Sequence, residues 1–278
     1  MQACYVPWLH MHQPLVWVNK NGKEILVSNL QKMLESSDTK VSWDAKLMAR
    51  AYKNPAKYCL LLRDQGYQAK IMLDFSGILL EELARMKDLL KKVEVEHEPI
   101  GDIIKLYKKV MKKYPSSMEF AGTAYAHCYF PATPKQDWDL QVKEWRKTFA
   151  KLFGRKSLKR VKGFWLPEMG VPASKDLEFL IRILKENGYE WLFIPLEAIK
   201  NERRMSQEER IRITSQPHLL KAGKEEIKVV VRVKHDIIDE QAGCDASCVF
   251  SKALEVSKTF KKFSNKPALV VPASDGEN

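Results

Sequence analysis

The sequence predicts an α/β protein whose parallel strands form an incomplete (β/α)7 barrel, an irregular relative of the TIM barrel. Three observations predict this fold: seven short runs rich in aromatic and β-branched residues, amphipathic helical patterns between them, and polar residues that gather where the strands end. The alternation of strand and helix continues without a break, which favours one barrel over two domains. An open, doubly wound sheet is the competing arrangement.

The seven expected strands share a high content of aromatic and branched side chains. They cover residues 3–9, 69–75, 118–124, 162–166, 190–194, 226–233 and 267–273. The six helical patterns between them cover residues 44–65, 77–92, 103–113, 138–153, 174–187 and 245–262. Pro55 predicts a break in the first helix, and Ser174 predicts the N-cap of the fifth. The highly charged segment 197–225 is expected to be an exposed helix and loop.

The composition is that of a folded globular chain. It has 278 residues, of which 45% are hydrophobic and 29% are charged, which excludes collagen, a coiled coil and a disordered chain. The net charge of +12 raises the question of a polyanionic partner. The most basic segment, 151–162, has no stacking motif, and its spacing indicates a solvated helix end. We therefore expect no nucleic-acid partner.

Targeting signals are not evident in the sequence. The N-terminus lacks the basic and long apolar regions of a secretory signal, and no stretch approaches the roughly 18 apolar residues of a membrane span. The five irregularly spaced cysteines do not suggest a disulfide framework. For Cys244 and Cys248, we expect two ordinary thiols rather than a metal site. These features predict a cytoplasmic protein without a membrane partner.

Polar residues cluster at the expected carboxyl ends of the strands, where parallel α/β folds place their sites. Four of the six histidines fall there, which is unexpected for histidines that serve only as surface polar groups. The polar residues at these ends are His10, His12, Gln13, Asp74, Ser76, Tyr125, His127, Glu168, His235, Asp236, Asp275 and Glu277.

Each of these residues also has a structural interpretation. His10 and His12 face the same way on an extended strand, so they are a buried hydrogen-bonded pair, a metal pair completed by Asp74, or ligands of a substrate. Glu168 lies in an apolar frame and is either an ion-pair partner or a catalytic carboxylate. Asp275 precedes a glycine, which is also typical of a turn.

Two carboxylates from different strands, on a rim with aromatic residues, suggest glycoside chemistry. One acid protonates the departing oxygen, and the other attacks or activates water. Trp8, Trp165, Tyr125 and Tyr129 offer flat apolar faces on which sugars stack. For the two tryptophans, a place in the barrel core is an equally good interpretation.

The motifs that carry these residues closely resemble glycoside hydrolase family 57, the retaining α-amylase-like enzymes, over nearly the whole chain and in the family order. The matching segments are LHMHQP, KIMLDFSGILLEEL, GTAYAHCYFP, GFWLPEMG, HDIID and SDGEN. AYKNPAK also resembles the archaeal branch of the family, more weakly. The resemblance implies an incomplete (β/α)7 barrel, no cofactor, and an α-glucan or maltooligosaccharide substrate.

The resemblance also implies roles for single residues. Glu168 stands at the position of the family nucleophile, and Asp275 at that of the acid/base, with Glu277 as its rival. The implied substrate-binding residues are His10, His12, His127, Trp165, Tyr125 and His235.

The sequence stops three residues after Asp275, whereas the family continues into a helical C-terminal domain. We expect a barrel spanning 1–278 that is truncated after its seventh strand, so activity of the chain alone is uncertain. A frameshift, a separate helical chain that docks onto the barrel, and a degenerate remnant are the competing explanations. Two other functions stay open: a metal-dependent polysaccharide deacetylase that uses His10, His12 and Asp74, and a non-catalytic glucan-binding protein.

Overall fold

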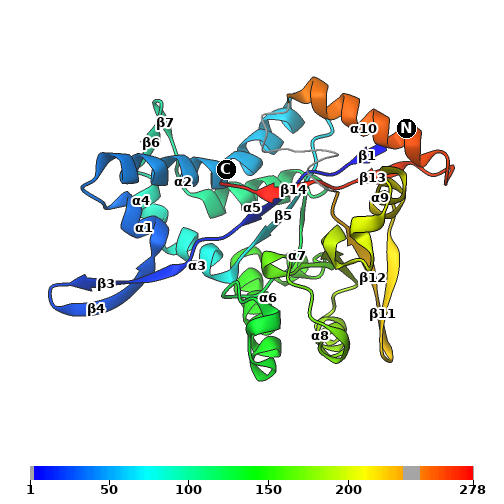
Figure 1. Cartoon of the computed structure of the whole chain (residues 1–278). Helices are drawn as coiled ribbons and strands as arrows, with labels where there is room; N and C mark the ends of the chain where they lie inside the picture. Colours follow the sequence, from blue (N-terminus) through cyan, green and yellow to red (C-terminus); the bar gives the residue numbers. More distant parts are fainter. Residues whose placement is uncertain (1–2, 234–244, 278) are drawn as a thin grey trace.

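The computed structural model describes residues 3–233 and 245–277 of the chain, and its parallel strands follow one another in sequence order (Figure 1). The first sheet has the order β14-β2-β5-β8, and the second has the order β9-β10-β12-β11. The strands of these sheets are β2 (Trp8–Met11), β5 (Ile71–Phe75), β8 (Met118–Phe120), β9 (Gly163–Trp165), β10 (Trp191–Ile194), β11 (His218–Ala222), β12 (Glu225–Val231) and β14 (Ala273–Asp275). Only β11 runs antiparallel to its neighbour in these two sheets, as the first strand of a hairpin with β12.

Two strand positions are interrupted at prolines. β1 (Ala3–Tyr5) pairs in parallel with β13 (Ala268–Val270), and β2 pairs in parallel with β14. The pairing continues between them, because the Val6 amide donates to Val270 and the Trp8 amide donates to Pro272. The first and seventh strand positions are therefore neighbours, as a barrel requires.

The two sheets join through backbone hydrogen bonds at Gly122. Its amide donates to the Gly163 carbonyl at 2.9 Å, and its carbonyl accepts from the Trp165 amide at 2.8 Å. On the other side, the Val233 amide donates to the Val271 carbonyl at 3.3 Å. Within the described residues no closed barrel forms, and the predicted incomplete (β/α)7 barrel is confirmed.

Ten α-helices lie in the described part of the chain, and most of them connect one strand to the next. They are α1 (Asn29–Leu34), α2 (Thr39–Asp64), α3 (Gly77–Arg85), α4 (Lys87–Leu90), α5 (Ile103–Lys113), α6 (Trp138–Phe153), α7 (Arg155–Leu158), α8 (Ser174–Glu186), α9 (Gln207–Thr214) and α10 (Ala246–Phe260). Side-chain caps fix several starts: Asp38 accepts from the amides of α2, Asp102 from α5, and Asp245 from α10.

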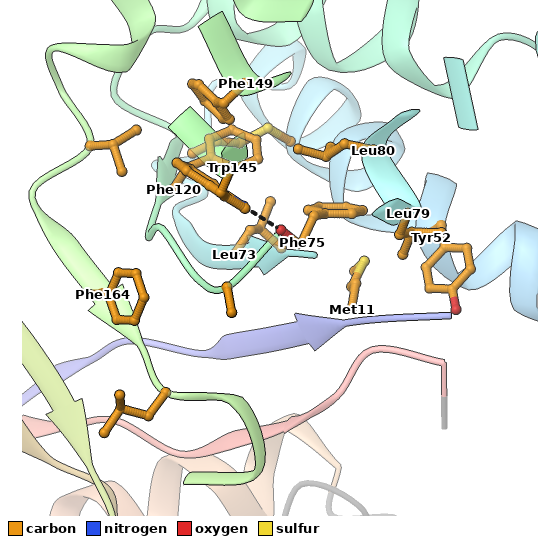
Figure 2. Close-up of a cluster of buried hydrophobic side chains, with 14 of the residues drawn as sticks. Met11, Tyr52, Leu73, Phe75, Leu79, Leu80, Phe120, Trp145, Phe149 and Phe164 are labelled. Atoms are coloured by element: carbon orange, nitrogen blue, oxygen red, sulfur yellow. Dashed lines mark hydrogen bonds between the residues drawn. The ribbon is translucent and has the colours of Figure 1, made fainter. Parts of the chain in front are cut away.

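A large apolar core fills the space between the first sheet and its helices (Figure 2). Phe75, Phe120 and Trp145 meet there from β5, β8 and α6, and the Trp145 indole donates to the Phe75 carbonyl at 2.7 Å. A second cluster lies inside the barrel and contains Trp8 and Trp165. Trp8 is fully buried, so it belongs to the barrel core and does not offer a face on which a sugar can stack.

Several local expectations are wrong. α2 continues through Pro55, and the N-cap of α8 is Ala173 rather than Ser174. The segment 197–225 holds the strand β11 besides its helix, and a small hairpin joins β6 (Glu94–Val95) to β7 (Glu98–Pro99). A longer hairpin of β3 (Leu15–Lys20) and β4 (Lys23–Ser28) projects from the body in Figure 1 and was not expected.

The cysteines and the membrane question have separate outcomes. Cys248 is disulfide-bonded, so it is not the ordinary thiol that we expected, and Cys244 lies outside the described residues. Cys4, Cys59 and Cys128 are free. Among the helices of the described residues, none combines the length and apolarity needed to cross a membrane.

Candidate active site

Sheet register places three polar residues in one row across neighbouring strands. Asp275 on β14 is the pairing partner of His10 on β2, and His10 is the partner of Asp74 on β5. Side chains at the same register level of parallel strands point to the same face. The row therefore lies at the carboxyl ends of strand positions seven, one and two, as the sequence predicts.

His10 is held by hydrogen bonds at both ring nitrogens. Its Nδ1 lies 2.6 Å from Oδ2 of Asp74, and its Nε2 lies 2.8 Å from Nε2 of His127. Asp74 is fully buried, and its Oδ1 accepts from the Trp8 indole at 2.8 Å. Both carboxylate oxygens of Asp74 are thus used inside the protein, which fixes the orientation of the His10 ring.

Four rings form a stacked column beside this row. Trp165 and His10 are nearly parallel, at 5° and 5.1 Å between centroids. His10 stacks on His127 at 4.8 Å, and His127 stacks on His12 at 4.0 Å. Nδ1 of His12 lies 2.9 Å from the hydroxyl of Ser76. We call Trp165, His10, His127, His12 and Asp74 the histidine wall.

The protonation of the wall differs from ring to ring. Burial opposes a charge on His10, but the Asp74 carboxylate, with Asp275 and Glu277 behind it, raises the pKa of His10 above its usual value. Burial, aided by the charge of His10, lowers the pKa of His12 to about 4. Burial and the charges of His12 and His10 lower the pKa of His127 to about 2. The wall therefore places its charge on His10 and keeps the other two rings neutral.

Glu168 approaches from a separate loop that follows β9. It lies in the short 3-10 turn Pro167–Met169, where Glu168 and Met169 both have left-handed backbone conformations, with φ of 54° and 53°. Such conformations cost about 1–3 kcal/mol for non-glycine residues and concentrate at functional sites. The Glu168 side chain is 70% exposed, and its Oε1 lies 3.8 Å from Nδ1 of His127. We call residues 167–170 the Glu168 loop.

The ring of Tyr129 packs against Gly170, the last residue of this loop. A Cβ at Gly170 would lie 2.2 Å from the Tyr129 ring, so a larger residue there would have to displace this ring. Tyr129 itself is 45% exposed. Close packing between this ring and the backbone of Gly170 limits where the Glu168 loop can lie.

A cavity of about 540 Å³ lies between the histidine wall and the Glu168 loop, a size typical of small-molecule sites. Glu168 and Asp275 both line it, together with His10 and Trp165. The remaining lining residues are Met169, Pro195, Glu197, Arg232, Ala273 and Ser274. The structure thus brings the two carboxylates predicted from the sequence to one cavity, which the rings of His10 and Trp165 also line.

Glu277 forms a third carboxyl group near this row. The amide of Gly276 donates to the His10 carbonyl at 2.7 Å, which holds the segment after β14 against β2. Burial raises the pKa of Glu277 to about 7, and the charges of Asp275 and Asp74 add to the effect. A carboxyl group that carries a proton near neutral pH is suited to acid–base chemistry.

Some expected residues do not reach the cavity. His12, His127 and Tyr125 are not among its lining residues. The Tyr125 ring lies against Gly77, and its hydroxyl donates to Glu81 at 2.8 Å. His235 and Asp236 lie outside the described residues. Glu197 and Arg232, which do line the cavity, were missed, although they follow β10 and β12 at the strand ends where the other site residues occur.

The hydrogen bonds of the wall can be compared with the possibility that His10, His12 and Asp74 bind a metal ion. Among the described residues, no group of three or more His, Cys, Asp or Glu side chains is arranged to hold a metal ion. Asp74 already accepts from His10 and Trp8, and His12 turns its Nδ1 to Ser76. These side chains are organised by hydrogen bonds to one another.

The fold and the cavity define a class of protein: an incomplete α/β barrel with paired carboxylates at the carboxyl ends of its strands. Within this class, the chain belongs to glycosyl hydrolase family 57, whose sequence model matches residues 6–278. A comparison with curated proteins finds no match.

Solved structures with a similar fold include a branching enzyme, a glucanotransferase and a probable polysaccharide deacetylase. A GH57-type branching enzyme from Pyrococcus horikoshii has a TM-score of 0.65 at 18% identity, with 100% of this chain and 64% of that chain covered. The 4-alpha-glucanotransferase from Thermococcus litoralis has a TM-score of 0.58 at 19% identity, with 98% and 33% covered. A probable polysaccharide deacetylase from Pseudomonas aeruginosa PAO1 has a TM-score of 0.51 at 7% identity, with 99% and 79% covered. The chain thus spans one third of the glucanotransferase and just under two thirds of the branching enzyme.

Proposed function

We propose that this chain is a catalytic barrel that acts on α-glucans by a retaining mechanism, as a glycoside hydrolase or a transglycosylase. The observation that carries the proposal is that Glu168 and Asp275 line one cavity with His10 and Trp165. Family membership and the fold shared with a branching enzyme and a glucanotransferase support an α-glucan as the substrate.

In the proposed reaction, a carboxylate oxygen of Glu168 attacks the anomeric carbon of the bound sugar. The glycosidic C–O bond breaks, and protonated Asp275 gives its proton to the departing oxygen. A glycosyl-enzyme ester on Glu168 results. Water or a sugar hydroxyl then attacks the same carbon and gives its proton to Asp275, which restores both carboxyl groups. Water gives hydrolysis, and a sugar hydroxyl gives transfer.

The surroundings of Glu168 suit a nucleophile. Its side chain is 70% exposed at the cavity, and its Oε1 lies 3.8 Å from Nδ1 of His127, which supports a reactive role rather than that of a buried ion-pair partner. The left-handed turn sets the carboxylate on a short, constrained loop rather than on a mobile one. His10 and Trp165 are proposed to contact the sugar, since both line the same cavity.

Covalent trapping tests the nucleophile directly. A slow glucosyl substrate, such as a 5-fluoro-α-glucosyl fluoride, should leave one glucosyl ester on the chain, and peptide mass spectrometry should find it on Glu168. Glu168→Gln should not be labelled. A label on Asp275 or Glu277 would overturn the assignment of roles.

The assay on the unlabelled chain then fixes the reaction type. Amylose, pullulan and maltotriose distinguish hydrolysis from transfer and α-1,4 from α-1,6 bonds, and product NMR shows whether the α-configuration is retained. Turnover by this chain alone would show that its activity does not require a separate helical chain. Saturable maltooligosaccharide binding without labelling or turnover would favour the non-catalytic function, and metal-dependent release of acetate would favour the deacetylase.

A further inference from the structure

The hydrogen bonds of the histidine wall form a continuous line from a buried carboxylate toward the exposed Glu168. Asp74 contacts His10, His10 contacts His127, and His127 faces Glu168. Only the last residue of this line is proposed to react. The proposed reaction assigns no step to Asp74 or His127, so their place in this line needs a separate explanation.

The contact between His10 and His127 restricts where protons lie. Two Nε2 atoms at 2.8 Å form a hydrogen bond only if one of them carries a proton and the other does not. Burial raises the pKa of Asp74, and the charge of His10 and the hydrogen bonds from His10 and Trp8 oppose that rise. While Asp74 is ionised, Nδ1 of His10 carries a proton and donates to the carboxylate in either case. Two arrangements remain, and they differ in what His127 presents to Glu168.

In the first arrangement, His10 is charged and donates from Nε2 to His127. Neutral His127 must then carry its proton on Nδ1, the atom that faces Glu168 Oε1 at 3.8 Å. In the second arrangement, His10 is neutral and accepts from Nε2–H of His127. The Nδ1 lone pair of His127 then faces a carboxylate, which is repulsive. The charge on His10 therefore decides whether His127 attracts or repels Glu168.

We propose that Asp74 is a positioning residue that acts through His10 to set the tautomer of His127, so that His127 directs its Nδ1–H at the Glu168 carboxylate. This inference rests on the proposed function in giving Glu168 the reactive role. An N–H directed at one oxygen holds the carboxylate in place and stabilises it again when the glycosyl ester breaks down. The Glu168 side chain is 70% exposed, so it has room to turn toward this N–H.

The electrostatics of the wall agree with the first arrangement. The groups that face His10 are Asp74 on β5, Asp275 on β14, Glu277 after it, and the neutral ring of His127. The carboxylate of Asp74, and after it that of Asp275, favours a charged His10, and Glu277 adds to this effect only once it loses its proton, near pH 7. His127 faces His10, His12 and Glu168, and burial with two neighbouring rings keeps it neutral. When the pH rises through the pKa of His10, the second arrangement replaces the first.

Ring-¹⁵N histidine NMR reads these tautomers without any need for turnover. Long-range ¹H–¹⁵N spectra of the full chain distinguish protonated from unprotonated ring nitrogens, and His10→Gln and His127→Gln assign the signals. At about pH 6, we expect a charged His10 and an Nδ1–H tautomer of His127. As the pH rises, His127 should change to the Nε2–H tautomer with the same midpoint as His10. A His127 that carries Nε2–H throughout, or that does not follow His10, overturns the proposal.

Two variants separate the causes. Asp74→Asn should lower the common midpoint by at least about one pH unit, because the neutral amide no longer favours charged His10. Glu168→Gln, the matched control at the other end of the line, should leave the His127 tautomer at about pH 6 unchanged and shift the midpoint much less than Asp74→Asn does, because Glu168 is exposed and 3.8 Å away. If Glu168→Gln reverses the tautomer, Glu168 rather than His10 sets it, and the proposal fails. If Asp74→Asn does not fold, the wild-type titration still decides.

Turnover gives an independent second measurement. If the chain hydrolyses maltooligosaccharides, kcat should fall above the His10 midpoint while KM changes little, and Asp74→Asn should move that alkaline limb downward. A fall in KM alone would contradict the positioning role. Failure of the covalent-trapping experiment would remove the proposed function and leave the NMR result standing, so the two proposals fail separately.

Discussion

The histidine wall and the Glu168 loop face each other across one cavity, but they are built in opposite ways. His10 and Asp74 of the wall lie on adjacent strands, and hydrogen bonds join Asp74, His10 and His127 to one another and His12 to Ser76. The loop leaves its carboxylate 70% exposed and reaches its position through two left-handed residues. The pair of His10 and Asp74 is thus fixed by sheet register, whereas the Glu168 loop, like His127 with its φ of 55°, is fixed by local backbone geometry.

This difference indicates how the two sides contribute to stability and to chemistry. Changes to the wall should affect the free energy of unfolding and its dependence on pH, because they leave buried polar groups without partners or remove their charge. Changes to the loop carboxylate should affect turnover and leave the fold intact. The predictions below test that separation, beginning with the largest effect.

Asp275→Asn should lower kcat on maltooligosaccharides by about 10²–10⁴-fold, because a general acid contributes that much when the leaving group is poor. An aryl α-glucoside with a good leaving group should lose much less. Glu277→Gln is the control, and it should cost less than about tenfold, since the amide resembles the protonated carboxyl that burial favours. A larger loss for Glu277→Gln than for Asp275→Asn would exchange the two roles.

Trp8→Phe should lower the free energy of unfolding by about 3–4 kcal/mol, because it removes a hydrogen bond to buried Asp74 and leaves a cavity. Urea denaturation measures this loss. Trp17→Phe is the matched control, since Trp17 lies 67% exposed on the β3–β4 hairpin, and it should change stability by less than about 0.5 kcal/mol. Glu168→Gln should be equally mild. Equal losses at Trp8 and Glu168 would remove the contrast between wall and loop.

Acid should destabilise the chain through the neutral histidines. The pKa of His12 is lowered to about 4 and that of His127 to about 2, so the unfolded chain takes up these protons first as the pH falls below about 6.5. The free energy of unfolding should then fall by about 1.4 kcal/mol per pH unit for each proton. His10 acts in the opposite sense: its raised pKa gives stability that is present at low pH and is lost as the pH rises through the folded value.

Urea midpoints at several pH values measure this slope. His127→Gln should reduce this slope by the contribution of one proton, about 1.4 kcal/mol per pH unit. His97→Gln, at an exposed position, should leave the slope unchanged. A slope that persists in full in His127→Gln would show that the acid sensitivity arises outside the wall.

Gly170→Ala should lower the free energy of unfolding by about 1 kcal/mol, because the new Cβ meets the Tyr129 ring, which is free to turn toward solvent. In a Tyr129→Ala background the same change should cost almost nothing, since the obstacle is gone. Thermal melting of the four proteins measures the coupling. An equal cost in both backgrounds would show that Tyr129 does not support the Glu168 loop.

The sequence predicted the strands better than the pieces between them. All seven barrel strands were expected at the correct places because buried parallel strands have a strong apolar signal. The β3–β4 hairpin was missed although Asn21-Gly22 is a strong hairpin turn, with φ of 55° and 78°. Pro55 did not break α2, since the apolar face around it is buried and offsets the lost hydrogen bond.

The candidate site shows the same division. Strand ends predicted His10, Asp74 and Asp275 as a group, and register brings them into one row. Tyr125 follows β8 as expected, but its ring turns to Gly77, which a pattern of residue types does not reveal. The pairing of His10 with His127 depends on the packing of two distant segments, so only the structure shows it.

The row of Asp275, His10 and Asp74 also has a consequence for how the chain folds. β2 lies near the beginning of the described chain, and β14 lies near its end. During synthesis, β2 can pair with β5 early, but its other edge stays open until β14, the last of the described strands, has been made. A nascent barrel therefore has the buried carboxylate of Asp74 in place before Asp275 arrives beside His10.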